Sequence, residues 1–89
     1  MYIHIGNNVV VRRRDIVAVF DLDNTSQSFL TRKYLAAAEK AGAVVNVAGD
    51  ELPKSFIVCA EGRGTQTVYL SQLNSSTLLR RSENLALNE

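Results

Sequence analysis

The segment AVFDLDNTSQSF, residues 18–29, contains the side chains whose types and spacing could do chemistry. An apolar run leads into Asp21, and Asp23 and Thr25 follow at alternate positions. Two carboxylates at this spacing could serve as nucleophile and proton donor in phosphoryl transfer, with Mg²⁺ bound beside them. The same chemistry needs further acidic ligands, a Ser or Thr and a Lys, all from later strand ends of a parallel sheet.

The remainder of the chain does not favour a phosphatase of the haloacid-dehalogenase superfamily, whose opening motif this segment resembles. Only 64 residues follow Thr25, and each parallel crossover takes at least about a dozen residues besides its strand. Downstream, the acidic pair Asp50-Glu51 stands beside Pro53 in a predicted turn, not at the end of a parallel strand. Phosphatase activity is therefore a distant third behind the two hypotheses given at the end of this subsection.

A helix start explains the same residues more simply. From Phe29 the apolar positions follow a helical period up to Ala41, and Gly42 directly after them is a typical helix stop. We predict a helix over 27–41. Asp23, Asn24 and Ser26 would then bond the free N–H groups of its first turn.

The other elements are predicted mainly as strands. Alternating or β-branched runs interrupted by Gly, Asn and Pro indicate six strands and, near residues 74–81, a short second helix. The strands fall at 2–5, 9–11, 16–20, 43–47, 55–60 and 65–70. The fold class is thus α+β: a small, mostly antiparallel sheet domain in the order βββ-α-βββ-α. Residues 1–81 form a single domain, and residues 82–89 are expected to be a flexible C-terminal tail.

Several predicted strands are apolar at consecutive positions, as in Val9–Val11, Ile16–Phe20 and Phe56–Ala60. Strands of this kind are usually covered on both faces. One long helix and one short helix cannot cover both faces of six strands, and a large uncovered apolar face is unusual for a monomer. We therefore expect a homo-oligomer.

Composition narrows the functional classes. The formal net charge is +1, so nucleic-acid binding would require basic residues gathered on one face. Cys59 is the single cysteine and stands in an apolar run, which favours a buried thiol. His4 has no second histidine or nearby cysteine to complete a metal site, and no cofactor is expected. Without a signal peptide or a membrane-length apolar run, the cytoplasm is the expected location.

Two groups of basic residues could bind an anion. Arg12, Arg13 and Arg14 end the second predicted strand, where alternation would place Arg12 and Arg14 on one face. Arg32 and Lys33 lie in the early turns of the predicted helix, where cations oppose the helix dipole. This position is understandable if a phosphate binds nearby. The alternative for any one of these residues is an ordinary solvated charge.

Three stretches in their order and spacing carry a family resemblance. IHIGNNVVVRRRDIVAVFDLDN, TRKYLAAAEKAG and SFIVCAEGRGTQTVYLS are similar to the RemA/RemB family of bacterial extracellular-matrix regulators. The HIGN start and FDLDN place the chain nearer the RemB branch. The resemblance runs from about Ile3 to Arg81 and implies a cytoplasmic DNA-binding transcriptional regulator controlling biofilm and matrix genes. It further implies a LytTR-like fold and a ring-shaped homo-oligomer, a heptamer or octamer, with a paralogous regulator as a candidate partner.

The resemblance also suggests which residues contact DNA. Arg14 matches a family arginine tied to DNA contact, and Arg32-Lys33 falls on a basic pair of the RemA branch; Arg13 and Lys54 are secondary. One departure stands out: the RemA branch has an arginine-rich turn where this chain reads GDELPKS, with Asp50 and Glu51. The leading hypothesis is an oligomer whose basic surface contacts phosphates of double-stranded DNA. An oligomeric protein-interaction or scaffold module without direct DNA binding is the alternative.

Overall fold

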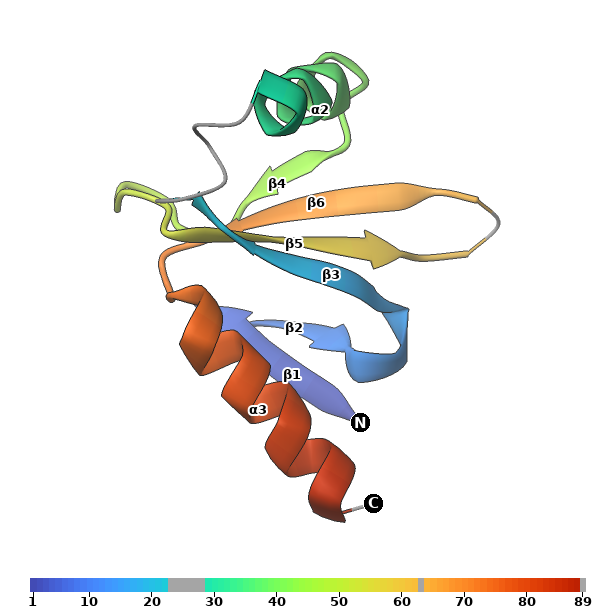
Figure 1. Cartoon of the computed structure of the whole chain (residues 1–89), viewed down its shortest axis with the longest axis vertical. Coiled ribbons are helices and arrows are strands. Elements are labelled where there is room, and N and C mark those ends of the chain that lie inside the picture. Colours follow the sequence, from blue (N-terminus) through green and yellow to red (C-terminus); the bar gives the residue numbers. More distant parts are fainter. Residues whose placement is uncertain (23–28, 63, 89) are drawn as a thin grey trace.

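The computed structural model describes residues 1–22, 29–62 and 64–88, the last five of these by their backbone alone. Two sheets and two long helices make up the described chain (Figure 1). The elements are β1 (Tyr2–Gly6), β2 (Val9–Arg12), a 3₁₀ turn η1 (Arg13–Asp15), β3 (Ile16–Asp21), α2 (Phe29–Lys40), β4 (Val44–Asn46), β5 (Ser55–Ala60), β6 (Gln66–Ser71) and α3 (Ser75–Asn88). The α+β class and the position of each predicted strand are confirmed within a residue or two at either end.

The strands divide between a hairpin and a larger sheet. Strands β1 and β2 pair with each other, and a four-stranded sheet has the order β3-β5-β6-β4. Among the described strands, the β1–β2, β3–β5 and β5–β6 pairs are antiparallel, as expected for a mostly antiparallel domain. The pairing of β4 with β6 is parallel. Helix α2 therefore connects β3 and β4 at opposite edges of the sheet, and this crossover was not predicted.

Strand β5 lies at the centre of the molecule and is buried on both faces. Phe56 and Val58 pack in one apolar cluster with Val68, and Leu35 and Ala38 of α2 pack against that cluster. The side chains that alternate with them belong to a second cluster, which unites the sheet with the hairpin and α3. Its fully buried members are Ile3, Ile5, Val11, Val47, Ile57, Cys59 and Leu78.

The sequence predicted that the helices would leave part of the sheet uncovered, and the structure confirms this only in part. The hairpin β1–β2 is not an extension of the main sheet but acts, with α3, as cover for one of its faces. Helix α2 lies over the other face (Figure 1). Large apolar side chains nevertheless stay exposed along β3 and α2, including Val17 at 59% and Leu30 at 74% exposure.

Two chain reversals follow from residues that accept positive φ. Gly6, Asn7 and Asn8 have φ of 123°, 44° and 65° and turn the chain between β1 and β2, as the sequence predicts. Helix α2 ends at Lys40, one residue before the predicted end, and Gly42 has the predicted role of a stop, with a φ of 72°. Gly42 N–H donates to Glu39 O and Ala43 N–H to Ala38 O, the two bonds of a Schellman motif. The predicted start of this helix at residue 27 and the capping residues Asp23, Asn24 and Ser26 lie outside the described residues.

Helix α3 corrects the prediction for the C-terminus. The sequence reading ended a short helix near residue 81 and assigned residues 82–89 to a flexible tail, but the helix continues to Asn88. Glu, Leu and Ala in this stretch are strong helix formers, so propensity favours continuation. Asn74 caps the start, since its Oδ1 accepts the N–H of Thr77 at 2.9 Å. No helix within the described residues is both long and apolar enough to span a bilayer.

Candidate functional site

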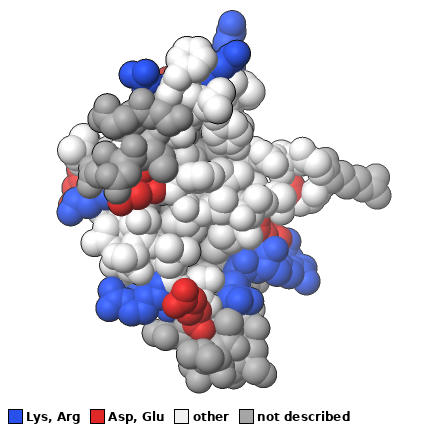
Figure 2. Space-filling view, viewed as in Figure 1, with Lys and Arg blue, Asp and Glu red and all other residues white. Residues whose placement is uncertain are grey.

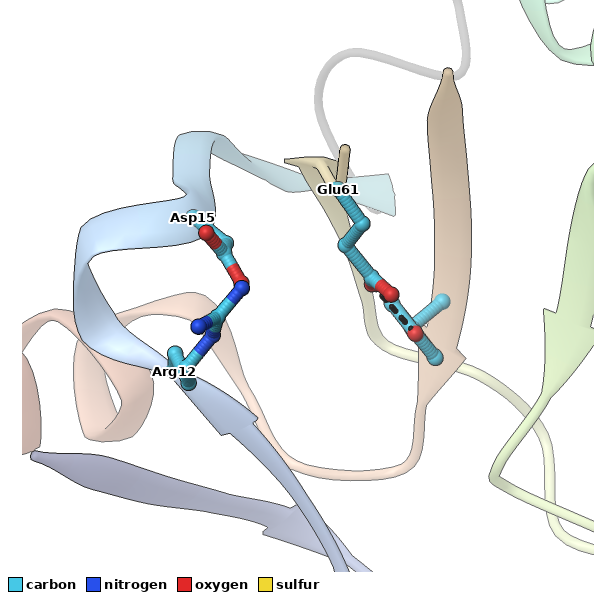
Figure 3. A network of polar contacts seen from close by, with 4 residues as sticks. Arg12, Asp15 and Glu61 are labelled. Atoms are coloured by element: carbon cyan, nitrogen blue, oxygen red, sulfur yellow. Dashed lines mark hydrogen bonds and ion pairs between the residues drawn. The ribbon is translucent and has the colours of Figure 1, made fainter. Parts of the chain in front are cut away.

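The three consecutive arginines do not continue a strand. Arg12 ends β2, and Arg13–Asp15 form the 3₁₀ turn η1, so the predicted extended strand through Arg14 is wrong. Strand alternation therefore does not apply to these residues, although Arg12 and Arg14 both line one pocket beside the turn. The turn has two anchors. Arg12 Nε contacts Asp15 Oδ2 at 2.9 Å (Figure 3), and Arg13 N–H donates to Met1 O at 3.0 Å. These two contacts hold the bent segment between β2 and β3 in place.

Arg13 and Arg14 differ in how their side chains are placed. Arg13 is half-buried, and its Nε donates to Ser82 O on α3 at 3.2 Å, which ties the turn to the C-terminal helix. Arg14 is exposed and makes no hydrogen bond or ion pair with any described residue. Of the two, Arg14 therefore has the guanidinium that is available to an external anion.

Arg32 and Lys33 are exposed on α2, as a solvent-accessible binding surface requires. The helix is held to the sheet by its other side, where Leu35 and Ala38 pack on the core. Tyr34 adds a polar contact, since its hydroxyl donates to Gln66 Oε1 of β6 at 3.2 Å. The sheet thus fixes the helix while leaving both cations accessible.

Lys54 stands at the end of the turn that precedes β5. Its N–H donates to Ser71 O at 2.8 Å, and its carbonyl accepts the N–H of Leu22 at 3.0 Å, so its backbone is fixed while its side chain is exposed. Asp50 and Glu51 are exposed in the same turn, and Leu52 is 82% exposed. The acidic residues therefore surround the one predicted cation of this turn.

The predicted cations do not form one patch within a subunit. Because Ile16 pairs with Cys59 and Asp21 with Ser55, Arg14 and Lys54 lie at opposite ends of β3. A six-residue strand separates them by about 17 Å. Helix α2 and the hairpin lie on opposite sides of the four-stranded sheet (Figure 1). Figure 2 accordingly shows Lys and Arg near α2 and again beside the hairpin and α3, with a broad uncharged region between.

An apolar groove of about 340 Å³ lies between β3 and α2. Its walls come from β3, from the neighbouring strands and from one side of α2. The lining residues are Val17, Ala18, Phe20, Leu30, Thr31, Tyr34, Phe56, Val58 and Gln66. Phe20 stacks on Phe56 with ring centroids 4.8 Å apart, which shapes the floor of the groove. We call this feature the β3–α2 groove.

A polar cluster lies beside η1 that the sequence analysis did not identify. Tyr69 donates its hydroxyl to Glu61 Oε1 at 2.6 Å, near the Arg12–Asp15 pair (Figure 3). Burial and the Glu61 carboxylate both raise the pKa of the Tyr69 phenol well above its usual range. Burial first, and then the carboxylates of Glu61 and Asp15, raise the pKa of the Cys59 thiol to about 11. The thiol is therefore protonated at neutral pH, which agrees with the packing role predicted for it.

The residues of the phosphatase hypothesis are not assembled as that chemistry requires. Asp21 ends β3, whose sheet neighbour β5 runs antiparallel, so the two strands do not present their carboxyl ends together. Asp23 and Thr25 lie outside the described residues. Within the described residues, no three His, Cys, Asp or Glu side chains group as metal ligands would.

Two contacts of α3 would have been hard to find from sequence. Arg81 Nη1 donates to His4 O at 2.8 Å, and Arg13 reaches Ser82 from the other end of the hairpin. The sequence predicted neither contact, because both acceptors are backbone carbonyls, which have no residue-type signature; it named Arg13 only as a candidate anion contact. Arg80 is exposed and makes no polar contact with a described residue.

Comparison with known proteins identifies the family. Residues 2–81 match the family model described as RemA-like, "Extracellular matrix regulatory protein A-like". The chain is also 39% identical over 83 residues to Extracellular matrix regulatory protein B of Bacillus subtilis (strain 168), an alignment covering 93% of this chain and 91% of that protein. Both findings confirm the resemblance drawn from the sequence, including its placement near the RemB branch. The chain belongs to the RemA-like family of extracellular matrix regulatory proteins.

Proposed function

We propose that this protein is a cytoplasmic transcriptional regulator of extracellular-matrix and biofilm genes, and that it binds double-stranded DNA as a homo-oligomer. Arg14 carries the proposal, because it is an exposed guanidinium on a turn that contacts to Asp15, Met1 and Ser82 hold in place. A pre-positioned guanidinium suits a phosphate, which it can bind with two parallel hydrogen bonds. Arg32 and Lys33 supply further phosphate contacts, with Arg13 and Lys54 in lesser roles.

Oligomerisation answers the separation of these cations. A subunit is 37 Å in its longest dimension, close to the roughly 34 Å of one turn of duplex DNA. Side-by-side copies would repeat η1 and α2 along the duplex, so that a small patch on each +1 subunit is multiplied. The β3–α2 groove is the proposed contact between copies, because it is apolar and its rim residues Val17 and Leu30 are exposed. A closed ring is the form we propose.

A gel-shift titration with duplex DNA at low and moderate salt tests this function. If several phosphates are contacted, affinity should fall by orders of magnitude between about 50 and 200 mM salt. Arg14→Ala should weaken binding at both salt concentrations without changing the mass of the oligomer. Arg80→Ala removes the same charge from an exposed position outside the proposed set and should have the smaller effect. Equal losses in the two variants would mean that Arg14 is not a specific contact.

The acidic turn favours a second candidate function. Asp50 and Glu51 are exposed where they would repel phosphate, and the neighbouring Leu52 is 82% exposed. Such a turn suits contact with a protein that has a basic surface, for which a paralogous regulator is one candidate. In that case the oligomer is a scaffold that does not itself bind DNA. An intact oligomer with no gel shift even at low salt would favour this function.

A further inference from the structure

A polar pocket of about 430 Å³ opens beside η1, on the same side of the molecule as the hairpin. Met1, Tyr2, Arg12, Arg13 and Arg14 line it. This volume lies within the roughly 300–1,000 Å³ of small-molecule sites. The pocket is distinct from the β3–α2 groove, and none of its residues lines that groove.

Strand pairing and backbone hydrogen bonds hold the walls of the pocket in place. Tyr2 of β1 and Arg12 of β2 are cross-strand neighbours, so the ring and the guanidinium stem arise side by side. The bond from Arg13 N–H to Met1 O holds the start of the chain against the arginine turn at 3.0 Å. Strand pairing and the 3₁₀ turn therefore fix the backbone on both sides of the pocket.

Donors for an anion remain available within it. A guanidinium has five N–H donors, and the contact of Arg12 with Asp15 uses its Nε. The Arg12 side chain makes no other polar contact with a described residue, and it is 42% exposed. Arg14 contributes its whole guanidinium. Two guanidiniums from alternate residues around a tight turn match the several acceptor oxygens of a phosphate group.

Tyr2 gives the pocket a feature that a backbone phosphate of duplex DNA would not use. It is 62% exposed at the pocket wall, and an exposed aromatic ring stacks on an unpaired base at about 1–3 kcal/mol per base. In a duplex, the bases are already stacked and paired. A ring next to a phosphate site therefore favours a ligand that brings a free base together with its phosphate.

We propose that this pocket binds a mononucleotide, with its phosphate on Arg12 and Arg14 and its base against Tyr2. Because Arg14 is also the leading proposed DNA contact, the bound nucleotide occupies a guanidinium that DNA needs. The pocket would then act as a regulatory site through which a nucleotide weakens DNA binding. This regulatory role rests on the proposed DNA-binding function, whereas nucleotide binding itself does not.

Calorimetric titration of the full chain with AMP and with ribose 5-phosphate tests the site. The base should make AMP the tighter ligand by roughly 5-fold or more, the ratio that the weaker end of the stacking range predicts. Tyr2→Leu should remove this preference and Tyr2→Phe should retain it, since phenylalanine keeps the ring. Arg14→Ala should weaken both ligands, while Arg80→Ala should leave both unchanged. Equal affinities in the wild type, or no AMP binding at millimolar concentration, would overturn the proposal.

A gel shift with AMP added separates this inference from the proposed function. Competition between AMP and duplex DNA supports the regulatory role. If DNA binds and depends on Arg14 but AMP does not bind, the pocket is a DNA phosphate contact only, and the nucleotide proposal fails alone. If AMP binds with the predicted Tyr2 dependence but DNA does not bind, the DNA-binding function fails and the nucleotide site stands.

Discussion

Gly6 lies in the turn of the hairpin that precedes η1, and its backbone conformation favours glycine. Its φ is 123°, and a Cβ there would lie 2.4 Å from Gln72 Oε1. We expect Gly6→Ala to lower the free energy of unfolding by about 1–3 kcal/mol, chiefly from backbone strain at this φ, because the atoms that a Cβ would meet are the end of the flexible Gln72 side chain and can move. Gly49→Ala is the matched control, since its φ is 64° and the nearest atom lies 3.9 Å away; it should cost about 1 kcal/mol. Urea unfolding measures both, and equal losses would mean that the φ of Gly6 adds no strain beyond that of an ordinary left-handed position.

Cys59 links stability to pH through its raised pKa. The thiol titrates near 9.0 when unperturbed and near 11 in the folded chain. Between these values the unfolded state has released the proton and the folded state still holds it, so stability should fall as pH rises. Cys59→Ala removes this contribution, while Tyr69, whose pKa is also raised, retains its own. Urea unfolding at pH 7 and pH 10 should therefore show a smaller drop for Cys59→Ala than for the wild type. An identical drop would mean that the thiol does not contribute.

At the residue scale, the sequence predicted some roles and not others. The burial of Cys59 and the turn at Gly6, Asn7 and Asn8 follow from residue types that tolerate few environments. The different placement of the Arg13 and Arg14 side chains does not follow from residue type. Two identical side chains in adjacent positions differ because a 3₁₀ turn aims one at a carbonyl of α3 and the other at solvent.

Among the elements, local pattern predicted the strands, and long-range pairing had to be learned from the structure. Four consecutive buried apolar positions in β5, Phe56–Cys59, explain why the sequence predicted cover on both faces of this strand. Nothing local distinguishes a hairpin that joins a sheet from one that covers it. The parallel pairing of β4 with β6 likewise depends on where α2 returns the chain, and that return is a tertiary choice.

Ser71 connects the two sheets, and this link can be tested. Its hydroxyl is fully buried, donates to Ile5 O at 2.6 Å and accepts the N–H of Leu73 at 3.0 Å. Ser71→Ala leaves a buried carbonyl and a partly buried N–H without this partner, so we expect a loss of about 1–3 kcal/mol in the free energy of unfolding. Ser76→Ala removes a hydroxyl from an exposed position and should stay within about 0.5 kcal/mol of wild type. If Ser71→Ala is equally mild, the Ser71 hydroxyl does not contribute to holding the hairpin on the sheet.

On the scale of the whole molecule, the arrangement of charge and apolar surface argues for assembly. Lys and Arg lie in separate places near α2 and beside the hairpin and α3, and the middle of the face shown in Figure 2 is largely uncharged. The β3–α2 groove has exposed Val17 and Leu30 at its rim. The consecutive apolar positions in the predicted strands indicated an uncovered apolar surface, and the fold shows that the β3–α2 groove is part of it. The hairpin, together with α3, covers the opposite face of the sheet.

The last prediction concerns that groove. Val17 is 59% exposed on β3, so Val17→Glu should not disturb the core, but it would place a charge in the proposed contact between copies. A carboxylate buried there without a partner is costly, and we expect the oligomer to dissociate toward the 9.8 kDa monomer. Sedimentation velocity at micromolar concentration measures the change. Leu79→Glu, at a 47% exposed position on α3, introduces the same charge outside the groove and should leave the mass unaltered. A wild-type chain that sediments as a monomer would remove the contact altogether, and equal dissociation in both variants would place it elsewhere.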